Sequence, residues 1–167
     1  MMHATAKTGH SSAGMLVLPH TRRATREQDL STVIEQAVEA RLVASAPRTD
    51  TVSATLRYDR RDPFAVRMTF PAQATLEGVE VVWEFARDLL MAGLRAPAGT
   101  GDVRVRPLGR DRAVLEFHAP EGVAMVETYA ADLHRFLTRT RHVVPLGFEH
   151  LFLDLDRDLA VLLRDAR

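Results

Sequence analysis

The chain has 167 residues, enough for one domain with a buried core, and its charge balances at 22 basic and 22 acidic residues. It has no cysteine, which excludes disulfide bonds, a thiolate nucleophile and cysteine-ligated metal sites. No apolar run approaches the ~20 residues that span a bilayer, and the apolar stretch at 15–19 is too short for a secretory signal. We therefore expect a cytoplasmic protein without a membrane span.

The first 31 residues differ in composition from the rest. They mix Met, His, Ala, Thr, Ser, Gly and Arg without a sustained period, and basic residues outnumber acidic ones. We interpret them as a disordered tail, with a basic arm as the alternative. We predict a single domain over 32–167, whose slight excess of acidic residues disfavours general binding to polyanions.

Residues 32–45 fit two kinds of secondary structure. As a strand they place Ile34 and Leu42 on one apolar face, and as a helix they begin with a capping box of Thr32 and Glu35. Periodicity does not decide between them.

Clear strand patterns follow. Apolar and polar residues alternate over 52–58 and over 64–70, on either side of a turn, so these segments predict a hairpin with one apolar face. A further strand carries its inward apolar residues at Val79, Val81, Trp83 and Phe85. Strands in succession before the first helix favour an antiparallel sheet.

The stretch from Trp83 to Pro107 marks a corner of the chain. Alternation changes to helical spacing at Leu89, Leu90 and Leu94, and Gly93 stands where a helix C-terminus favours a left-handed residue.

The second half of the chain continues with strands and ends in helices. Strands are predicted over 103–106, 113–118 and 123–128, followed by a helix over 129–143. The buried face of that helix is predicted to consist of Leu133, Phe136, Leu137 and Thr140. Asp154 or Asp156 then caps a C-terminal helix with its apolar side chains at Leu155, Leu159, Leu162 and Leu163.

No group of residues indicates catalysis, a metal or a cofactor. Three aspartates from Asp154 to Asp158 resemble the start of a calcium loop, but Leu159 replaces the glycine that its sharp turn needs. The glycine-rich loop at 99–102 leads into a strand instead of a helix and is interpreted as a turn. The histidines lack metal-ligand spacing: His118, His134, His142 and His150. Glu80 and Glu84 are too far apart for shared acid–base work and are expected to pair with arginines.

Arginines on the polar faces of the strands suggest an alternative, a protein that binds single-stranded nucleic acid. The residues concerned are Arg57, Arg67, Arg104 and Arg106. Such binding surfaces need aromatic residues between the arginines to stack on bases, whereas here the strand aromatics fall on the apolar faces. We therefore do not expect nucleic-acid binding.

Several motifs resemble the landmarks of one family. WEFARDLL from Trp83, followed by GL and by GDVRVRP, resembles the signature of the SsgA-like proteins, regulators of sporulation and cell division in sporulating actinobacteria. Further matches, in the same order, are LRYD at 56–59, DPFAVRMTF at 62–70, FLTRT at 136–140, VP at 144–145, EH at 149–150 and LDLD at 153–156. One residue departs from the pattern, because Arg106 replaces a tryptophan that is usual in the family. We expect it to form a salt bridge with a neighbouring carboxylate.

The resemblance implies a fold and a role. It implies a long first strand and an α+β fold, with a mainly antiparallel sheet of about seven strands, a long helix and a C-terminal helix in a Whirly-like subunit. It further implies a homotrimer and a non-enzymatic, SsgB-like regulator without a cofactor. Its expected partners are FtsZ, septal peptidoglycan machinery or an SsgA-like paralogue, with recruitment to division septa. We expect self-association through the edge of the first strand, since open sheets leave edges to pair.

Overall fold

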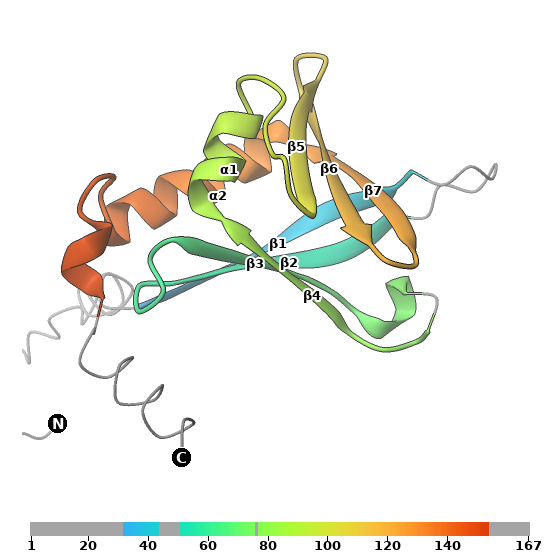
Figure 1. Ribbon diagram of the computed structural model, residues 1–167, viewed down its shortest axis with the longest axis horizontal. Coiled ribbons are helices and arrows are strands. Elements are labelled where there is room, and N and C mark those ends of the chain that lie inside the picture. The colour runs from blue at the N-terminus through green and yellow to red at the C-terminus, as the bar shows by residue number, and fades with distance from the viewer. Residues whose placement is uncertain (1–31, 44–50, 76, 154–167) are drawn as a thin grey trace, which may run out of the picture. The chain divides into compact units, whose positions relative to one another are not determined.

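Seven strands form one antiparallel sheet in the computed structural model, which describes residues 32–43, 51–75 and 77–153 (Figure 1). The strands are β1 (Val33–Leu42), β2 (Thr51–Asp59), β3 (Ala65–Phe70), β4 (Val81–Ala86), β5 (Val103–Leu108), β6 (Arg112–Ala119) and β7 (Gly122–Tyr129). The helices are α1 (Arg87–Gly93) and α2 (Ala130–Val143), with single 3₁₀ turns at η2 (Ala72–Ala74) and η3 (Glu149–Phe152). The predicted α+β class is confirmed, including a strand over the ambiguous first segment. The predicted tail over 1–31 and the C-terminal helix lie outside the described residues.

The sheet is built from two wings, in the order β4-β3-β2-β1-β7-β6-β5. β1 pairs with β2 from Val33 to Arg41, but within the described residues it pairs with β7 through Ala40–Leu42 alone. The four-stranded wing therefore curls toward the three-stranded wing, so that their apolar faces meet. The Phe117 ring of β6 lies 5.6 Å from the ring of Phe70 and 5.1 Å from that of Trp83, measured between centroids.

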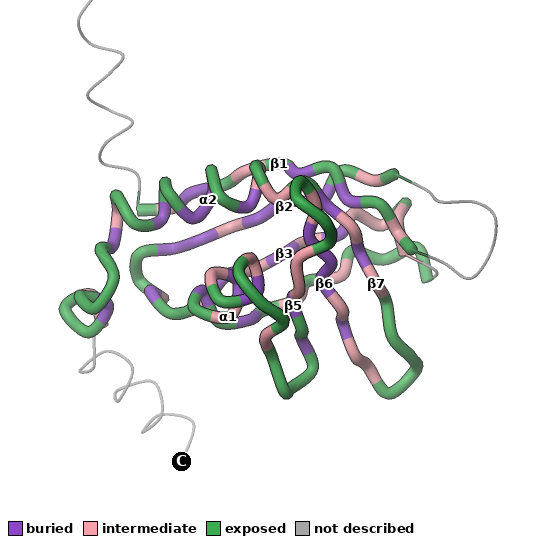
Figure 2. The backbone as a smooth tube through the Cα atoms, turned by 90° about the horizontal axis from the view of Figure 1, so that it is seen from above, coloured by how far each residue is buried: buried purple, intermediate pink, exposed green. Residues whose placement is uncertain are grey.

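Helix α2 covers the part of β1 that β7 leaves unpaired. Gln36 donates its side-chain N–H to the carbonyl of Asp132 at 2.8 Å, and Arg139 donates to the carbonyl of Glu35 at 3.0 Å. The apolar side of α2 is buried as predicted, at Leu133, Phe136, Leu137 and Thr140 (Figure 2). The expectation that β1 is a sheet edge is wrong, because β1 lies at the centre of the sheet; β4 and β5 are its outer strands.

Gly93 has a different role from the predicted one. It lies inside α1 and does not adopt the left-handed conformation. A Cβ atom added there would lie 2.3 Å from the Cβ of Val105, so glycine is needed because α1 packs directly on β5.

Two residues predicted on the inner face are exposed instead. Phe64 is 50% exposed and Val79 is 53% exposed. Each lies just before its strand begins, at Ala65 and Val81, so the alternation of the strand does not extend to it.

Candidate partner-binding surface

Arg87, the first residue of α1, is 1% exposed and lies at the centre of a buried polar cluster. Its guanidinium donates to the Tyr58 hydroxyl at 3.1 Å and to the carbonyl of Val144 at 2.9 Å, and it forms an ion pair with Glu149. Tyr58 in turn donates to the carbonyl of Pro63 at 3.1 Å. We call Arg87, Tyr58 and Glu149, with these two carbonyls, the Arg87 cluster.

The Arg87 cluster shifts the pKa of its two acidic members in opposite directions. Burial raises the pKa of Tyr58 to about 12, an effect that the neighbouring Arg87 charge opposes without cancelling. Burial also acts to raise the pKa of Glu149, but the N–H groups of Glu149 and Gly147 and the charge of Arg87 outweigh it. The pKa of Glu149 therefore lies below its ordinary value. Both shifts favour the pair of a neutral tyrosine and an ionised glutamate at neutral pH.

The landmark motifs of the sequence meet in the Arg87 cluster. LRYD supplies Tyr58, DPFAVRMTF supplies Pro63, and FARDLL supplies Arg87. VP and EH supply Val144 and Glu149. Segments that are far apart in the chain therefore share one buried set of hydrogen bonds. The strand pattern placed Tyr58 on an apolar face and gave no sign of its contact with Arg87.

Exposed apolar side chains lie on the segments that the Arg87 cluster joins. The backbone carbonyl of Phe64 accepts a hydrogen bond from the backbone N–H of Arg87 at 2.7 Å. The segment after α2 is joined to the Arg87 guanidinium through the carbonyl of Val144 and the carboxylate of Glu149. Four apolar side chains on these segments are 43–64% exposed. We define the end surface as Phe64, Leu146, Phe148 and Leu151.

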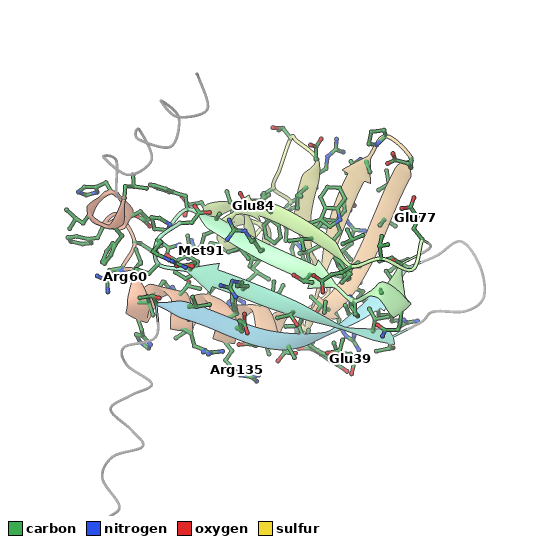
Figure 3. The ribbon with its side chains drawn as sticks, turned by 90° about the horizontal axis from the view of Figure 1, so that it is seen from below. Glu39, Arg60, Glu77, Glu84, Met91 and Arg135 are labelled. Carbon is green, nitrogen blue, oxygen red and sulfur yellow. The ribbon has the colours of Figure 1, made fainter. Side chains whose placement is uncertain are left out.

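The turn between β2 and β3 supports the same end of the molecule. The Arg60 guanidinium lies 4.6 Å from the centroid of the Phe152 ring, beside η3 (Figure 3). Arg61 holds Asp59 through two side-chain hydrogen bonds, which are the main reason that the pKa of Asp59 is lowered. The η3 turn thus contacts the β2–β3 turn through Phe152 and the Arg87 cluster through Glu149. Exposed apolar groups on such a scaffold are typical of a protein-binding surface.

The strand arginines are mostly engaged by carboxylates. Arg57 pairs with Glu35 at 2.6 Å, and Arg106 pairs with Glu116 at 3.2 Å, as expected for the residue that replaces the family tryptophan. Arg67 pairs with both Glu84 and Asp62. Arg104 is exposed, with its Cα opposite Glu116 in the sheet.

The remaining sequence candidates form no site in the part of the chain that the structure describes. Within these ranges no group of His, Asp and Glu could hold a metal ion, and no helix is long and apolar enough to cross a membrane. His118 lies 3.5 Å from Glu116, whereas the other three histidines lie on or after α2. The aspartates from Asp154 onward lie outside the described residues.

Comparison with known proteins identifies the family. Residues 52–149 match the family described as "Streptomyces sporulation and cell division protein, SsgA". The chain belongs to the SsgA family. It is 44% identical to the sporulation-specific cell division protein SsgB of Streptomyces coelicolor over 82% of this chain and 100% of that protein. It is 37% identical to SsgB of Kineococcus radiotolerans, over 92% of this chain and 88% of that one.

Solved structures of SsgA family members have the same fold. A structure reported as "Mutations in SsgB correlate to longitudinal cell division during sporulation of Streptomyces coelicolor" is 42% identical, with a TM-score of 0.65 over 73% of this chain and 96% of that chain. An SsgA-like sporulation-specific cell division protein from Thermobifida fusca is 32% identical, with a TM-score of 0.68 over 77% of this chain and 94% of that chain. These relatives confirm the predicted family and its role in sporulation and cell division.

Proposed function

We propose that this SsgA family member is a non-enzymatic adaptor that positions FtsZ, or the septal peptidoglycan machinery, during sporulation-linked division. The supporting observation is the end surface. Three of its exposed apolar side chains lie on the segment after α2, which a buried ion pair joins to α1, and the fourth is Phe64, whose carbonyl accepts from the backbone N–H of Arg87. An exposed apolar surface suits binding to a protein, because the partner removes apolar area from water.

The oligomer and the location belong to the same proposal. The subunits form a homotrimer that is recruited to division septa, where several end surfaces in one assembly strengthen binding to a filament. The outer strands of the described sheet are β4 and β5, and Val105 of β5 is already paired with Ala98. Light scattering at micromolar concentration should give the mass of three chains, before and after deletion of residues 1–31. A monomer would contradict this part of the proposal.

Co-sedimentation with FtsZ filaments tests the role of the end surface. Phe148→Asp and Leu151→Asp place a charge where the partner would exclude water, and each should reduce the bound fraction at least about tenfold. Val82→Asp is the matched control, since Val82 is 51% exposed and lies on β4, outside the end surface. If all three variants bind filaments equally, the end surface is not the binding site.

Single-stranded nucleic acid is the competing partner, and the ion pairs of the strand arginines disfavour it. Phosphate binding by Arg57, Arg67 or Arg106 would require each to leave a carboxylate. Oligonucleotide anisotropy on the same preparation should therefore show weak binding even at low salt. Tight binding that weakens steeply with salt, reduced in Arg104→Ala and accompanied by no filament binding, would replace the adaptor proposal.

A further inference from the structure

A second apolar surface lies between the two wings of the sheet, on other elements than the end surface. It is a groove of about 420 Å³ lined by β4 and η2 on one side and by the start of β7 on the other. Figure 1 shows these elements close to the β6–β7 turn. Its described lining residues are Leu42, Val43, Phe70, Ala74, Thr75, Glu77, Val81, Trp83, Phe117, Val123, Ala124, Met125 and Val126.

The floor of the groove is packed, whereas its walls are open. Phe70 and Phe117 are almost fully buried beneath it, and Trp83 lies against Phe117 and is partly exposed. On the wall, Val123 is 56% exposed and the neighbouring Ala124 is exposed as well. The groove has the size of ligand-binding pockets, which span roughly 300–1,000 Å³ and are mostly apolar. It can therefore accept apolar groups onto a floor that is already formed.

The charge in the described lining of the groove is acidic. It belongs to Glu77, which lies beside the β6–β7 hairpin (Figure 3). Because the described lining contains no arginine or lysine, a carboxylate or phosphate head group would find no counter-charge there. A positive charge next to an apolar group fits better.

The outer edge of β4 favours a peptide as the occupant. β4 is an outer strand of the described sheet, so its outer backbone groups pair with no other strand, while Val81 and Trp83 face the groove. An extended chain could bind this edge through its backbone and insert alternate side chains into the groove. We propose that the groove binds a short extended segment of a partner protein that carries apolar side chains beside arginine or lysine. This inference does not depend on the end surface.

Trp83 provides a direct readout, because it is the single tryptophan of the chain and lines the groove. Two synthetic peptides blocked at both ends, GRLFLRG and GELFLEG, share the same apolar centre, carry arginine or glutamate at the same two positions and contain no tryptophan. Titration of the full-length protein with GRLFLRG should shift the Trp83 emission to a saturating value. GELFLEG should bind at least about tenfold more weakly, because its carboxylates meet the carboxylate of Glu77 and no basic residue of the described lining.

Variants of the groove distinguish specific binding of the peptide from non-specific hydrophobic binding. Ala124→Phe places a large side chain in the groove and should lower the affinity for GRLFLRG at least about tenfold. Val123→Arg should reverse the preference between the two peptides, and its exposed position makes it tolerable to the fold. Glu77→Gln should reduce the preference for the arginine peptide. Asp88→Asn, which removes the same charge from the first turn of α1, should leave that preference unchanged.

Three results would overturn the proposal. One is the absence of a saturable emission shift with GRLFLRG. Another is equal affinity for both peptides that persists in a folded Val123→Arg variant. The third is displacement of GRLFLRG by phosphatidylcholine vesicles, which would make a lipid surface the occupant of the groove. Loss of FtsZ binding in the end-surface variants, with peptide binding intact, would leave the two sites independent as inferred.

Discussion

Arg87 and Glu149 are separated by 62 residues in the sequence and form a buried ion pair that joins α1 to the segment after α2. The segment after α2 carries most of the end surface. Loss of this pair should therefore affect both the stability of the fold and the proposed binding to a partner. The first two predictions concern this pair.

Arg87→Ala should destabilise the fold by ~3–5 kcal/mol, because it leaves Glu149 buried without its counter-charge and empties the space of a large side chain. Chemical denaturation measures the change. Arg67→Ala is the control, since its pairs with Glu84 and Asp62 lie at the surface, where such pairs contribute about 1 kcal/mol or less. Equal losses in the two variants would contradict a dominant role for the Arg87 cluster.

Acid should weaken the fold partly through Glu149. Since its pKa is lowered in the folded protein, its stabilising contribution is complete above the ordinary glutamate pKa and is lost as pH falls through the lowered value. Glu149→Gln should thus be less stable at neutral pH and lose less stability on acidification. Denaturation midpoints compared between neutral pH and pH 3 test this. Parallel pH dependence in wild type and variant would show that Glu149 does not contribute.

Tyr58 should make the fold sensitive to alkali. Its folded pKa of about 12 lies above the ordinary 10.0, so the stability it contributes is complete below pH 10 and decreases as pH rises towards 12. Tyr58→Phe should remove part of this alkaline loss while forfeiting the hydrogen bonds to Pro63 and Arg87. Spectrophotometric titration of tyrosinate in the wild type and in Tyr58→Phe should show an ionisation at a pH of about 12 that the variant lacks.

Gly93→Ala should destabilise the fold by ~1–3 kcal/mol, because the added methyl group overlaps the side chain of Val105. Val105→Gly removes both side-chain atoms of Val105, Cβ and Cγ1, that the added methyl group would meet. The double variant should therefore lose less stability than the sum of the two single losses, and thermal denaturation of all four proteins measures the difference. Additive losses would show that α1 moves away from β5 without resistance.

Local patterns in the sequence predicted the elements well, because strand alternation and the apolar stripe of α2 depend on residues close in the chain. They failed at element ends. Phe64 continues the alternation of β3 in the sequence, yet it precedes the strand and is exposed. Gly93 fits a helix C-cap by position. Glycine is required there, however, because any larger residue would collide with Val105 of β5.

The end surface and the Arg87 cluster could not be predicted from local patterns. An arginine at the start of a helix is ordinarily exposed, and Arg87 is buried because Tyr58, Val144 and Glu149 reach it from distant segments. The available signal was that all of them stand in landmark motifs of the family. Arg106 shows the opposite case: its partner Glu116 lies on the adjacent strand of a predicted hairpin, and the expected salt bridge is present.

The three-residue junction between β1 and β7 also bears on the order of folding. Every other strand pair in the described sheet joins consecutive strands, whereas β1 and β7 come from opposite halves of the chain. Each wing is a meander that can form from local contacts, and the loop-closure entropy of joining the wings is lost in one late step. Pulse-labelling hydrogen exchange should therefore protect the amides of the hairpins before that of Val43, which donates to the Met125 carbonyl of β7 across the junction. The protein then folds as two halves that meet, and the groove between them takes shape last.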